Sequence, residues 1–550
     1  MTTPTLRTPI AIIGGGTGGV AAALALARIG QRCVLVEPTH WIGGQLTSQA
    51  VPPDEHRWIE SFGCTRSYRD FRNRVRAHYR AHESLTPDAA ANDHLNPGGG
   101  WVSRLCMEPR VAHAVLRDML EQAASPGVVT LLTRHTWTAA ETHADRVTGV
   151  TLTDLDSGAE THLEADYFLD ATELGDLLAL ADVEHRIGAE GKDAFGELHA
   201  PEKADPNDQQ AFSWCFALEH RPGEDHTIDR PDDYDFWRTY IPDMRGVERE
   251  RWTYPLFSWT VPSHNDEGRR TFPFVPPPDE PSDGAWDMWR YRRIVEHAAH
   301  TDVRPDVCLV NWVQMDYWQK PLLGVSPEAQ REALAGARAQ SRAFLYWMQT
   351  DAPRHDSDTR TGYAGLKLHG DALGSTPETG EGFAQAAYIR EPRRLVARTT
   401  IHEGHVGTQQ RAAEGHLPTD AHEFGSAHPF ADSVGIGHYP IDLHPSTAGR
   451  NSIYVGAAPF QIPMGALVPV RTHNVLAAGK CLGVTHVTNG CYRLHPVEWN
   501  IGEAAGMLAA WSLKHARPAA DIHADADAVA AFQNHLVRSG FELRWPWDPA

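Results

Sequence analysis

A glycine loop near the start of the chain constrains its fold more than any other feature. Gly14, Gly16 and Gly19 follow the apolar run PIAIIG and open the Ala- and Leu-rich segment TGGVAAALALARIG. A second apolar run, QRCVLVE, then ends in Glu37. This order of strand, turn, helix, strand and acid is typical of a dinucleotide-binding Rossmann unit. A P-loop is excluded because no Gly-Lys-Ser/Thr follows the glycines.

Each residue of this pattern has a physical task. Gly14 permits a tight turn, Gly16 lets the backbone approach a pyrophosphate, and Gly19 lets the helix pack closely on the sheet. The helix N-terminus offers unpaired N–H groups and a partial positive charge to the phosphates. Glu37 ends the second strand, where a carboxylate accepts the ribose hydroxyls. An acid at this place serves either FAD or NAD, and the chain has no second glycine loop of this kind.

Length, charge and cysteine content limit the remaining classes. A chain of 550 residues exceeds one compact core. Its formal net charge of −21 argues against a nucleic-acid partner, which needs a basic surface. No run of 18 apolar residues predicts a membrane span, and the first residues lack the features of a signal peptide. Seven scattered cysteines without a CxxC pair indicate reduced thiols in a cytoplasmic enzyme, and the histidines show no metal-ligand spacing, so we expect no metal.

The rest of the chain predicts a nucleotide-binding domain made from both ends. Residues 108–124 have the pattern of an amphipathic helix, and VVTLLTR, RVTGVTLTD and ETHLEADYFLDAT alternate like three neighbouring antiparallel strands. Two helices are expected in SPEAQREALAGARAQSRAFLYWMQ, and a strand and a helix return in NVLAAGKCLG and VEWNIGEAAGMLAAWSLKHA. We therefore expect an α/β fold: a discontinuous Rossmann-type domain (1–195 and 431–515) with an inserted α+β substrate domain (196–430) and a C-terminal helical tail (516–550).

Further motifs resemble those of a known family. WIGGQLTSQ follows Glu37, and later come GGGWVSRLCMEPRVA, FLDATELGDLLALA, NWVQMDYW, AAYIREPRRL, DSVGIGHYPIDLHPS and a block that contains NVLAAGKCLGVTHVTNGCYRLHPVEWNIGEAAG. Over about residues 9–515 the chain resembles the bacterial FAD-dependent oxidoreductases of the glutathione-reductase-like flavoprotein superfamily. The resemblance implies FAD as the cofactor. One departure is Glu173, where relatives usually have glycine; it adds a carboxylate near the expected FAD contact.

The resemblance also implies a set of cofactor contacts. The glycine loop would hold the phosphates, Glu37 the adenosine ribose, and the WIGGQLTS loop the ribityl chain and the flavin edge. The start of the 496–510 helix would approach the isoalloxazine, where a helix N-terminus stabilises the negative charge of a reduced flavin, and Pro496 suits such a terminus. The implied contacts are Gly14, Gly16, Thr17, Gly18, Gly19, Glu37, Gly43, Gly44, Gln45, Thr47, Gly479 and Pro496.

Polar residues just before that helix are the catalytic candidates. We expect His495 or Tyr492 to handle a proton while hydride passes to flavin N5. Arg493 and Asn489 are expected to position the substrate or the flavin carbonyls. The competing interpretation is structural: these side chains cap the helix and satisfy backbone groups.

Two other segments are candidates for substrate binding. Asp316 and Tyr317 lie in an alternating aromatic run, which predicts either a face that lines a cleft or a solvated strand edge. Arg390 belongs to a charge run with two further arginines and Glu391, which predicts either an anion site or an ion-pair network.

Together these features predict an enzyme that oxidises a polar alcohol or amine by two electrons, with hydride passing to FAD. The partners would be a small-molecule substrate and an electron acceptor, either O₂ or a protein. Two alternatives stay open: a flavin monooxygenase with an external reductant, and a flavoprotein redox subunit without a small substrate of its own. The substrate, the acceptor and the oligomeric state are not written in the sequence.

Overall fold

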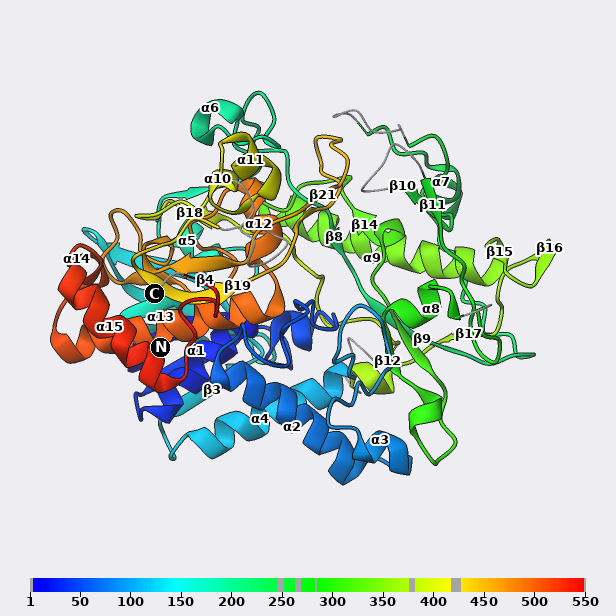
Figure 1. The fold of residues 1–550 in the computed structure, drawn as a ribbon, viewed down its shortest axis with the longest axis horizontal. Coiled ribbons are helices and arrows are strands. Elements are labelled where there is room, and N and C mark those ends of the chain that lie inside the picture. The colour runs from blue at the N-terminus through cyan, green and yellow to red at the C-terminus, as the bar shows by residue number, and fades with distance from the viewer. Residues whose placement is uncertain are drawn as a thin grey trace.

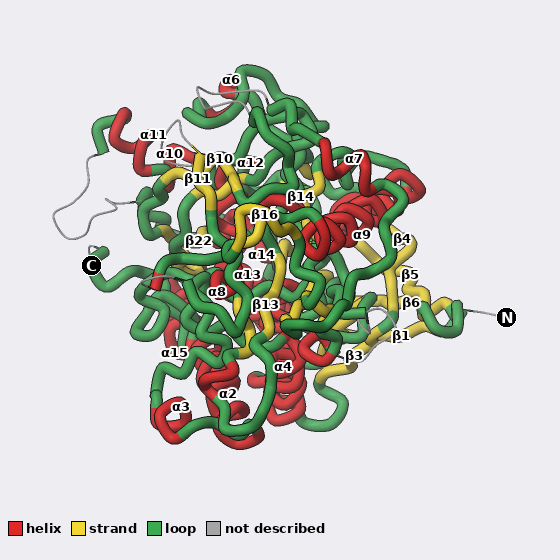
Figure 2. Tube along the Cα trace, turned by 90° about the vertical axis from the view of Figure 1, so that its right-hand side faces the viewer, coloured by secondary structure: helices red, strands yellow, loops and turns green. Residues whose placement is uncertain are grey.

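The largest sheet in the described part of the chain is a mixed sheet of seven strands. The computed structural model describes residues 3–244, 252–262, 269–281, 284–374, 381–416 and 427–548. The strand order is β3-β2-β1-β6-β5-β4, and β23 pairs with the other end of β6. Most of the strands stand in a row in Figure 2. The strands are β1 (Thr5–Ile13), β2 (Cys33–Glu37), β3 (Val129–Thr133), β4 (His135–His143), β5 (Arg146–Asp154), β6 (Glu160–Asp170) and β23 (Val475–Ala477).

The first Rossmann unit forms as the sequence predicts. β1 pairs in parallel with β2, with Ile13 opposite Val36, and the two strands are joined through helix α1 (Thr17–Arg28). The residues of α1 from Thr17 to Ala27 are all buried. This complete burial explains why the helix is built almost entirely from small and aliphatic side chains, which leave no polar face.

The C-terminal part of the chain completes this unit. β23 pairs in parallel with β6, with Val475 opposite Phe168. Helix α13 (His495–His515) packs on α1, where an added Cβ on Gly506 would lie 3.0 Å from the Ala22 carbonyl oxygen. In Figure 1 the orange and red C-terminal helices lie beside the blue N-terminal elements. The predicted α/β, Rossmann-type fold class is confirmed, and the sheet is indeed built from both ends of the chain.

Two secondary-structure predictions are wrong. VVTLLTR forms β3, which pairs in parallel with β2 at the far end of the sheet, and the antiparallel partner of β5 is instead the unpredicted β4. An alternating pattern reports which face of a strand is buried and carries no information on the pairing partner. The two helices expected around 326–349 are one continuous helix, α9 (Pro327–Thr350), because Gly336 within it packs against Tyr317 and does not break it.

Between residues 211 and 389 lies a second core, rich in tryptophan, tyrosine and phenylalanine. It contains α9 and an antiparallel sheet of order β12-β13-β9-β17, and its green ribbon occupies the right side of Figure 1. The sheet strands are β9 (Phe216–His220), β12 (Arg293–Val295), β13 (Val307–Val310) and β17 (Leu366–Leu368). The predicted domain boundaries remain a prediction. Buried residues 395–406 (Leu395, Ala397, Ile401 and Val406) belong to the first core although the expected insertion runs to 430.

The remaining helices and strands surround these two parts. The helices are α2 (Arg66–His82), α3 (Pro87–Ala91), α4 (Pro109–Ala123), α5 (Asp176–Leu180), α6 (Lys192–Phe195), α7 (Tyr234–Thr239), α8 (Met288–Tyr291), α10 (Glu403–Val406), α11 (Thr408–Ala413), α12 (His486–Tyr492), α14 (Ala519–His523) and α15 (Ala526–Ser539). Two-stranded ladders are formed by β7 (His185–Arg186) with β18 (Arg394–Leu395), β8 (Phe212–Ser213) with β14 (Asp316–Tyr317), β10 (Thr260–Pro262) with β11 (Arg269–Thr271), β15 (Pro353–Arg354) with β16 (Ser357–Thr361), β19 (Ser433–Gly437) with β22 (Phe460–Pro463), and β20 (Ile441–Leu443) with β21 (Ile453–Val455). Within the described ranges, no helix is both long enough and apolar enough to cross a bilayer.

Candidate functional site

The glycine loop turns tightly between β1 and α1. Gly14 has φ +100°, and an added Cβ there would run into the backbone of Ala171 at the end of β6. Gly16 is the N-cap of α1. Gly18 and Gly19 are packing positions, because an added Cβ would collide with the carbonyl oxygens of Ala478 and Gly14 respectively. The first N–H groups of α1 are therefore presented next to glycines, where the backbone itself carries no Cβ.

Glu37 closes the loop from the side of β2. The buried carboxylate accepts hydrogen bonds from the Gly15 amide at 3.0 Å and from the Thr39 amide and hydroxyl at 2.8 and 2.6 Å. Burial raises the pKa of Glu37 to about 7, and the hydrogen bonds from Thr39 oppose this shift. The acid thus lies beside the glycine loop, where a ribose would meet it.

The second glycine loop packs directly on the first. Gly43 and Gly44 both have positive φ, at +114° and +54°. The Gly43 amide donates to the Gly15 carbonyl oxygen at 2.8 Å, and the Thr17 hydroxyl donates to the Gly43 carbonyl oxygen at 3.0 Å. Gly44 approaches the first loop so closely that an added Cβ would lie 2.8 Å from Gly16 Cα. The Thr47 hydroxyl stabilises the second loop internally, because it donates to the Ile42 carbonyl oxygen at 2.7 Å.

A charged cluster lies next to the two loops. Lys480 is buried, forms an ion pair with Glu173 and donates to the Ile389 carbonyl oxygen at 2.8 Å. Glu173 is the residue at which the sequence departs from its relatives. Its buried Oε1 has no hydrogen-bond partner among the described residues and would lie 2.6 Å from a Cβ on Gly16. The carboxylate therefore does stand beside the phosphate loop, and Lys480 supplies its counter-charge.

The start of α13 faces the same region. Gln45 of the second loop donates to Glu498 and, at 2.9 Å, to the Arg493 carbonyl oxygen. Burial raises the pKa of Glu498 to about 7, whereas Lys480 lowers it. Gly479 lies here too, since its added Cβ would be 3.3 Å from Glu498 Oε1. Pro496 is in the first turn of the helix, one residue later than the predicted first position.

His495 is completely buried at the N-terminus of α13. The Asp54 amide donates to His495 Nδ1 at 3.0 Å, so the ring proton is on Nε2. Burial, together with the cations Arg292 and Lys480, lowers the pKa of His495 well below its usual value. Within the described chain no acceptor meets Nε2 with full hydrogen-bond geometry, although the Val51 backbone acts on the ring and opposes the fall in its pKa. His495 is therefore a neutral imidazole whose N–H is not used by a well-formed hydrogen bond to the described residues.

Two residues that we did not single out from the sequence lie beside His495. Arg292 joins α8 to β12, and its Nη2 is 3.9 Å from Asp54 Oδ1. Both side chains are buried; Asp54 Oδ1 and two guanidinium nitrogens, Nε and Nη1, lack hydrogen-bond partners within the described part of the molecule. Burial raises the pKa of Asp54, although Arg292 and Arg493 oppose the shift. The only feature of the sequence that could have drawn attention to Asp54 is its position shortly after the second glycine loop. No sequence motif draws attention to Arg292.

Arg493 completes this buried polar cluster, which we define as Asp54, Arg292, Asp442, Arg493 and His495. The Arg493 guanidinium donates to the Tyr388 hydroxyl at 2.8 Å and forms an ion pair with Asp442 at 3.2 Å. Its charge and that of Asp442 both act on the pKa of Asp54. Arg493 and His495 are thus brought together as expected, although 441 residues separate Asp54 from His495 along the chain.

Two other candidates from the same segment point elsewhere. The buried Tyr492 donates to the Gln461 carbonyl oxygen at 2.8 Å and stacks on Phe460. Asn489 accepts a hydrogen bond from Gln210 at 3.2 Å, and its buried Nδ2 has no partner among the residues described. Because the Tyr492 hydroxyl is already used by the backbone, we leave Tyr492 out of the proposed chemistry.

The candidate substrate residues Asp316 and Tyr317 lie on opposite faces of strand β14, and Arg390 pairs with the first of them. Asp316 pairs with Arg390 at 3.0 Å and with His444 at 2.6 Å. Burial opposes ionisation of Asp316, but these two groups prevail and lower its pKa. Arg390 also stacks on Tyr388, the partner of Arg493, so this network borders the polar cluster. Tyr317, the next residue on β14, points into the second core instead.

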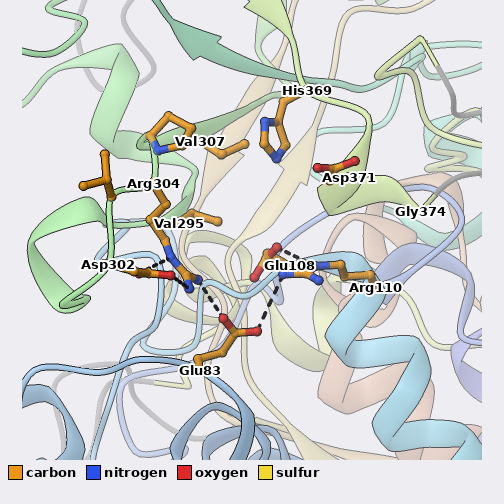
Figure 3. A pocket seen from close by; sticks show the side chains of 12 residues that line it. Glu83, Glu108, Arg110, Val295, Asp302, Arg304, Val307, His369, Asp371 and Gly374 are labelled. Carbon is orange, nitrogen blue, oxygen red and sulfur yellow. Dashed lines mark hydrogen bonds and ion pairs between the residues drawn. The ribbon is translucent and has the colours of Figure 1, made fainter.

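A separate surface pocket of about 580 Å³ lies away from these residues. Figure 3 shows Glu83 between Arg304 and Arg110, with His369 and Asp371 nearby. Glu83 is 2.7 Å from Arg304 and 3.6 Å from Arg110. The two arginines that line the pocket, Arg110 and Arg304, are both paired with carboxylates that line it. The lining residues contain none of the buried unpartnered atoms found in the described chain. We therefore place the candidate site at the polar cluster.

Comparison with known families decides the class of the protein. The model of the FAD dependent oxidoreductase family matches residues 9–536. The chain belongs to this family. FAD is therefore its cofactor, as the sequence resemblance implied, and the protein is an oxidoreductase. The finer assignment to one superfamily and its motif group remains a prediction.

Other comparisons are less specific. A search of the curated proteins gives no match. Among solved structures, the flavin-dependent monooxygenase PieE, in complex with FAD and substrate, is 18% identical, with 40% of this chain and 36% of that chain covered and a TM-score of 0.24. The myxobacterial halogenase CndH is 17% identical, with 39% and 44% covered and a TM-score of 0.23. OxyS anhydrotetracycline hydroxylase from Streptomyces rimosus is 16% identical, with 42% and 41% covered and a TM-score of 0.22. Likenesses of this extent do not bear on the reaction.

The residues of the chain fit FAD. The two glycine loops meet at the N-terminus of α1. Side chains are excluded at the contact, because an added Cβ on Gly16 or on Gly44 would collide with Glu173 Oε1. Buried Oε1 atoms of Gln45 and Glu173 border the same place without partners among the described residues. The bare backbone with its N–H groups suits a pyrophosphate, and the open oxygens of Gln45 and Glu173, which only accept hydrogen bonds, suit the hydroxyls of a ribityl chain.

Proposed function

We propose that this oxidoreductase oxidises a polar small molecule, an alcohol or an amine, by two electrons at the buried polar cluster. The supporting observation is the set of unpartnered atoms: Nε and Nη1 of Arg292, Nε2 of His495 and Oδ1 of Asp54. Buried polar groups in proteins almost always have partners, so four open atoms in one cluster indicate groups kept for a ligand. An anaerobic absorbance screen of alcohols, amines and sugars for bleaching of the bound flavin tests this function.

Asp54 is the group that we propose takes the substrate proton. Burial raises its pKa, which makes the carboxylate a stronger base than an exposed aspartate, and Oδ1 is open. The proposed FAD contacts remain those of the two glycine loops, Glu37 and the start of α13. When bound, FAD supplies the two-electron chemistry by accepting hydride from the substrate carbon.

His495 receives a different role from the one expected from the sequence. Its Nδ1 accepts from the Asp54 amide, which leaves Nε2 as a donor and not as a proton acceptor. We propose that this N–H donates to negative charge on the bound substrate or cofactor. Arg493 is held by Asp442 and Tyr388, and we propose that it positions the same groups electrostatically.

We expect the purified protein to be yellow and to release FAD, and not FMN or nicotinamide, on acid precipitation. The family and the two glycine loops both require the full dinucleotide. Chromatography of the acid supernatant checks this. A colourless protein that cannot be reconstituted with FAD would contradict the assignment.

We also expect that NADPH is not consumed in proportion to turnover. The sequence contains a single glycine loop of the dinucleotide type, and FAD occupies it under this proposal. Anaerobic mixing of the yellow protein with micromolar NADPH, followed at the flavin absorbance, measures this. Rapid bleaching would favour the monooxygenase alternative, in which NADPH is the external reductant of the flavin and O₂ takes up the electrons.

A further inference from the structure

We propose that the substrate carries a carboxylate or equivalent anionic group, and that Arg292 binds it. This inference rests on the proposed function, because it names the class of molecule oxidised at the same cluster. Arg292 follows helix α8, whose Met288 and Trp289 belong to the second core, and its charge acts on His495 at the start of α13. Sites between two cores are common places for small ligands.

The guanidinium of Arg292 is buried without an adequate counter-ion. Its nearest carboxylate oxygen, Asp54 Oδ1, is 3.9 Å away, beyond hydrogen-bond reach. Two of its three nitrogens lack acceptors within the described ranges. Its Cζ lies 5.1 Å from the ring centre of Tyr291, which holds the group in place without neutralising it. Arginine stays charged in proteins, so this buried cation needs an anion.

Other buried arginines in this region do have close carboxylates. Arg390 is 3.0 Å from Asp316, Arg493 is 3.2 Å from Asp442, and Arg394 is 2.9 Å from Glu190. These side chains are as buried as Arg292 or more so. Each of these three arginines leaves only its Nε without a partner among the described residues, whereas Arg292 leaves both Nε and Nη1 and has no carboxylate within hydrogen-bond reach. This is the arrangement expected of a ligand-binding arginine.

The position of the open atoms also limits the ligand. Asp54 Oδ1, the proposed proton acceptor, is 3.9 Å from Arg292 Nη2. The imidazole of His495, which accepts a hydrogen bond from the Asp54 backbone amide, is the third member of the group. A substrate that meets Arg292 with its anionic group therefore presents its hydroxyl or amine to Asp54 a few bonds away. Small hydroxy acids and amino acids have this shape.

Binding of unreactive anions to the FAD-loaded enzyme tests the proposal. The probes are acetate and benzoate, with acetamide and benzamide as uncharged matches, and the readouts are perturbation of the flavin visible spectrum and the melting temperature. We expect a carboxylate to bind and its amide not to bind. Arg292→Gln should weaken carboxylate binding roughly 10- to 100-fold, the usual effect of losing a charged hydrogen bond, and Arg292→Lys should recover part of it.

Arg290→Gln is the matched control. Arg290 is two residues away on α8 and lies 3.4 Å from Glu280, so the same loss of charge should leave carboxylate binding unchanged. Three results would overturn the inference: no effect of either carboxylate on the wild type, equal binding by Arg292→Gln, or loss of FAD from both Arg292 variants, which would assign the arginine to the cofactor.

The same screen separates this inference from the proposed function. If carboxylates bind through Arg292 but no alcohol or amine bleaches the flavin, the anion site stands and the proposed oxidation fails. If uncharged alcohols or amines bleach the flavin as fast as hydroxy or amino acids do, the oxidation stands and the anion site fails.

Discussion

Asp54→Asn is expected to slow bleaching of the bound flavin by substrate about 10²–10⁴-fold, the usual contribution of a positioned base. The variant should keep its FAD and its fold, because asparagine has the same size and the Asp54 amide that donates to His495 is retained. Anaerobic stopped-flow absorbance measures the rate, with FAD content and a melting curve beside it. Glu55→Gln is the control: this neighbour faces Arg72 and Tyr68, so it should cost stability without a comparable loss of rate.

The pH dependence follows from the same carboxylate. Burial raises the pKa of Asp54 above its ordinary value near 3.8, so the proton leaves only at higher pH. A base works when deprotonated, and the wild-type rate should therefore rise with pH through this raised pKa and then level off. Asp54→Asn should lose that rise. A normal rate in the variant would remove Asp54 from the mechanism.

The variant His495→Asn distinguishes the two candidates for the residue that accepts the substrate proton, His495 and Asp54. If His495 were the proton acceptor, as the sequence suggested, this variant would lose about 10²–10⁴-fold and Asp54→Asn would not. If His495 is a neutral donor to a negatively charged group, the loss should be roughly 10- to 100-fold, the worth of a hydrogen bond to a charged group (about 1.5–3 kcal/mol), and Asp54→Asn should be the slower of the two variants. The same stopped-flow measurement on both variants decides between them.

Gly16→Val is expected to abolish FAD binding while the chain remains folded. Gly16 has φ −63°, which any residue adopts, so the effect is steric. A Cβ there would already lie 2.6 Å from Glu173 Oε1, and the two methyl groups of valine would extend into the space between the two glycine loops. Flavin fluorescence titration of the apoprotein and a melting curve measure affinity and folding separately.

Gly30→Val is the matched control for this variant. Gly30 follows the other end of α1, and an added Cβ there contacts nothing within 4 Å. Its φ of +69° should cost about 1–2 kcal/mol of stability, yet FAD binding should persist. Full flavin occupancy in Gly16→Val would mean that the glycine loop is only a turn.

The sequence alone was sufficient for the parts of the fold that depend on local pattern. The strand, turn and helix around Gly14–Gly19 are encoded within 30 residues by periodicity and by glycines with separate steric duties. The long helix with small residues, α13, was recognisable because Gly502 and Gly506 permit close approach to α1. The family motifs then implied FAD, which the family match confirms.

Only the tertiary structure decided which side chains share a site. Asp54, Arg292 and His495 belong to three distant segments, and no local pattern reports that a turn after α8 meets the start of α13. Tyr492 and His495 are three residues apart, yet the helix boundary between them points one into the core and the other toward the open cluster. Strand β3 likewise found its partner through the packing of the whole sheet. Alternation and helical spacing specify which face of an element is buried; the identity of what covers that face depends on the packing of remote segments.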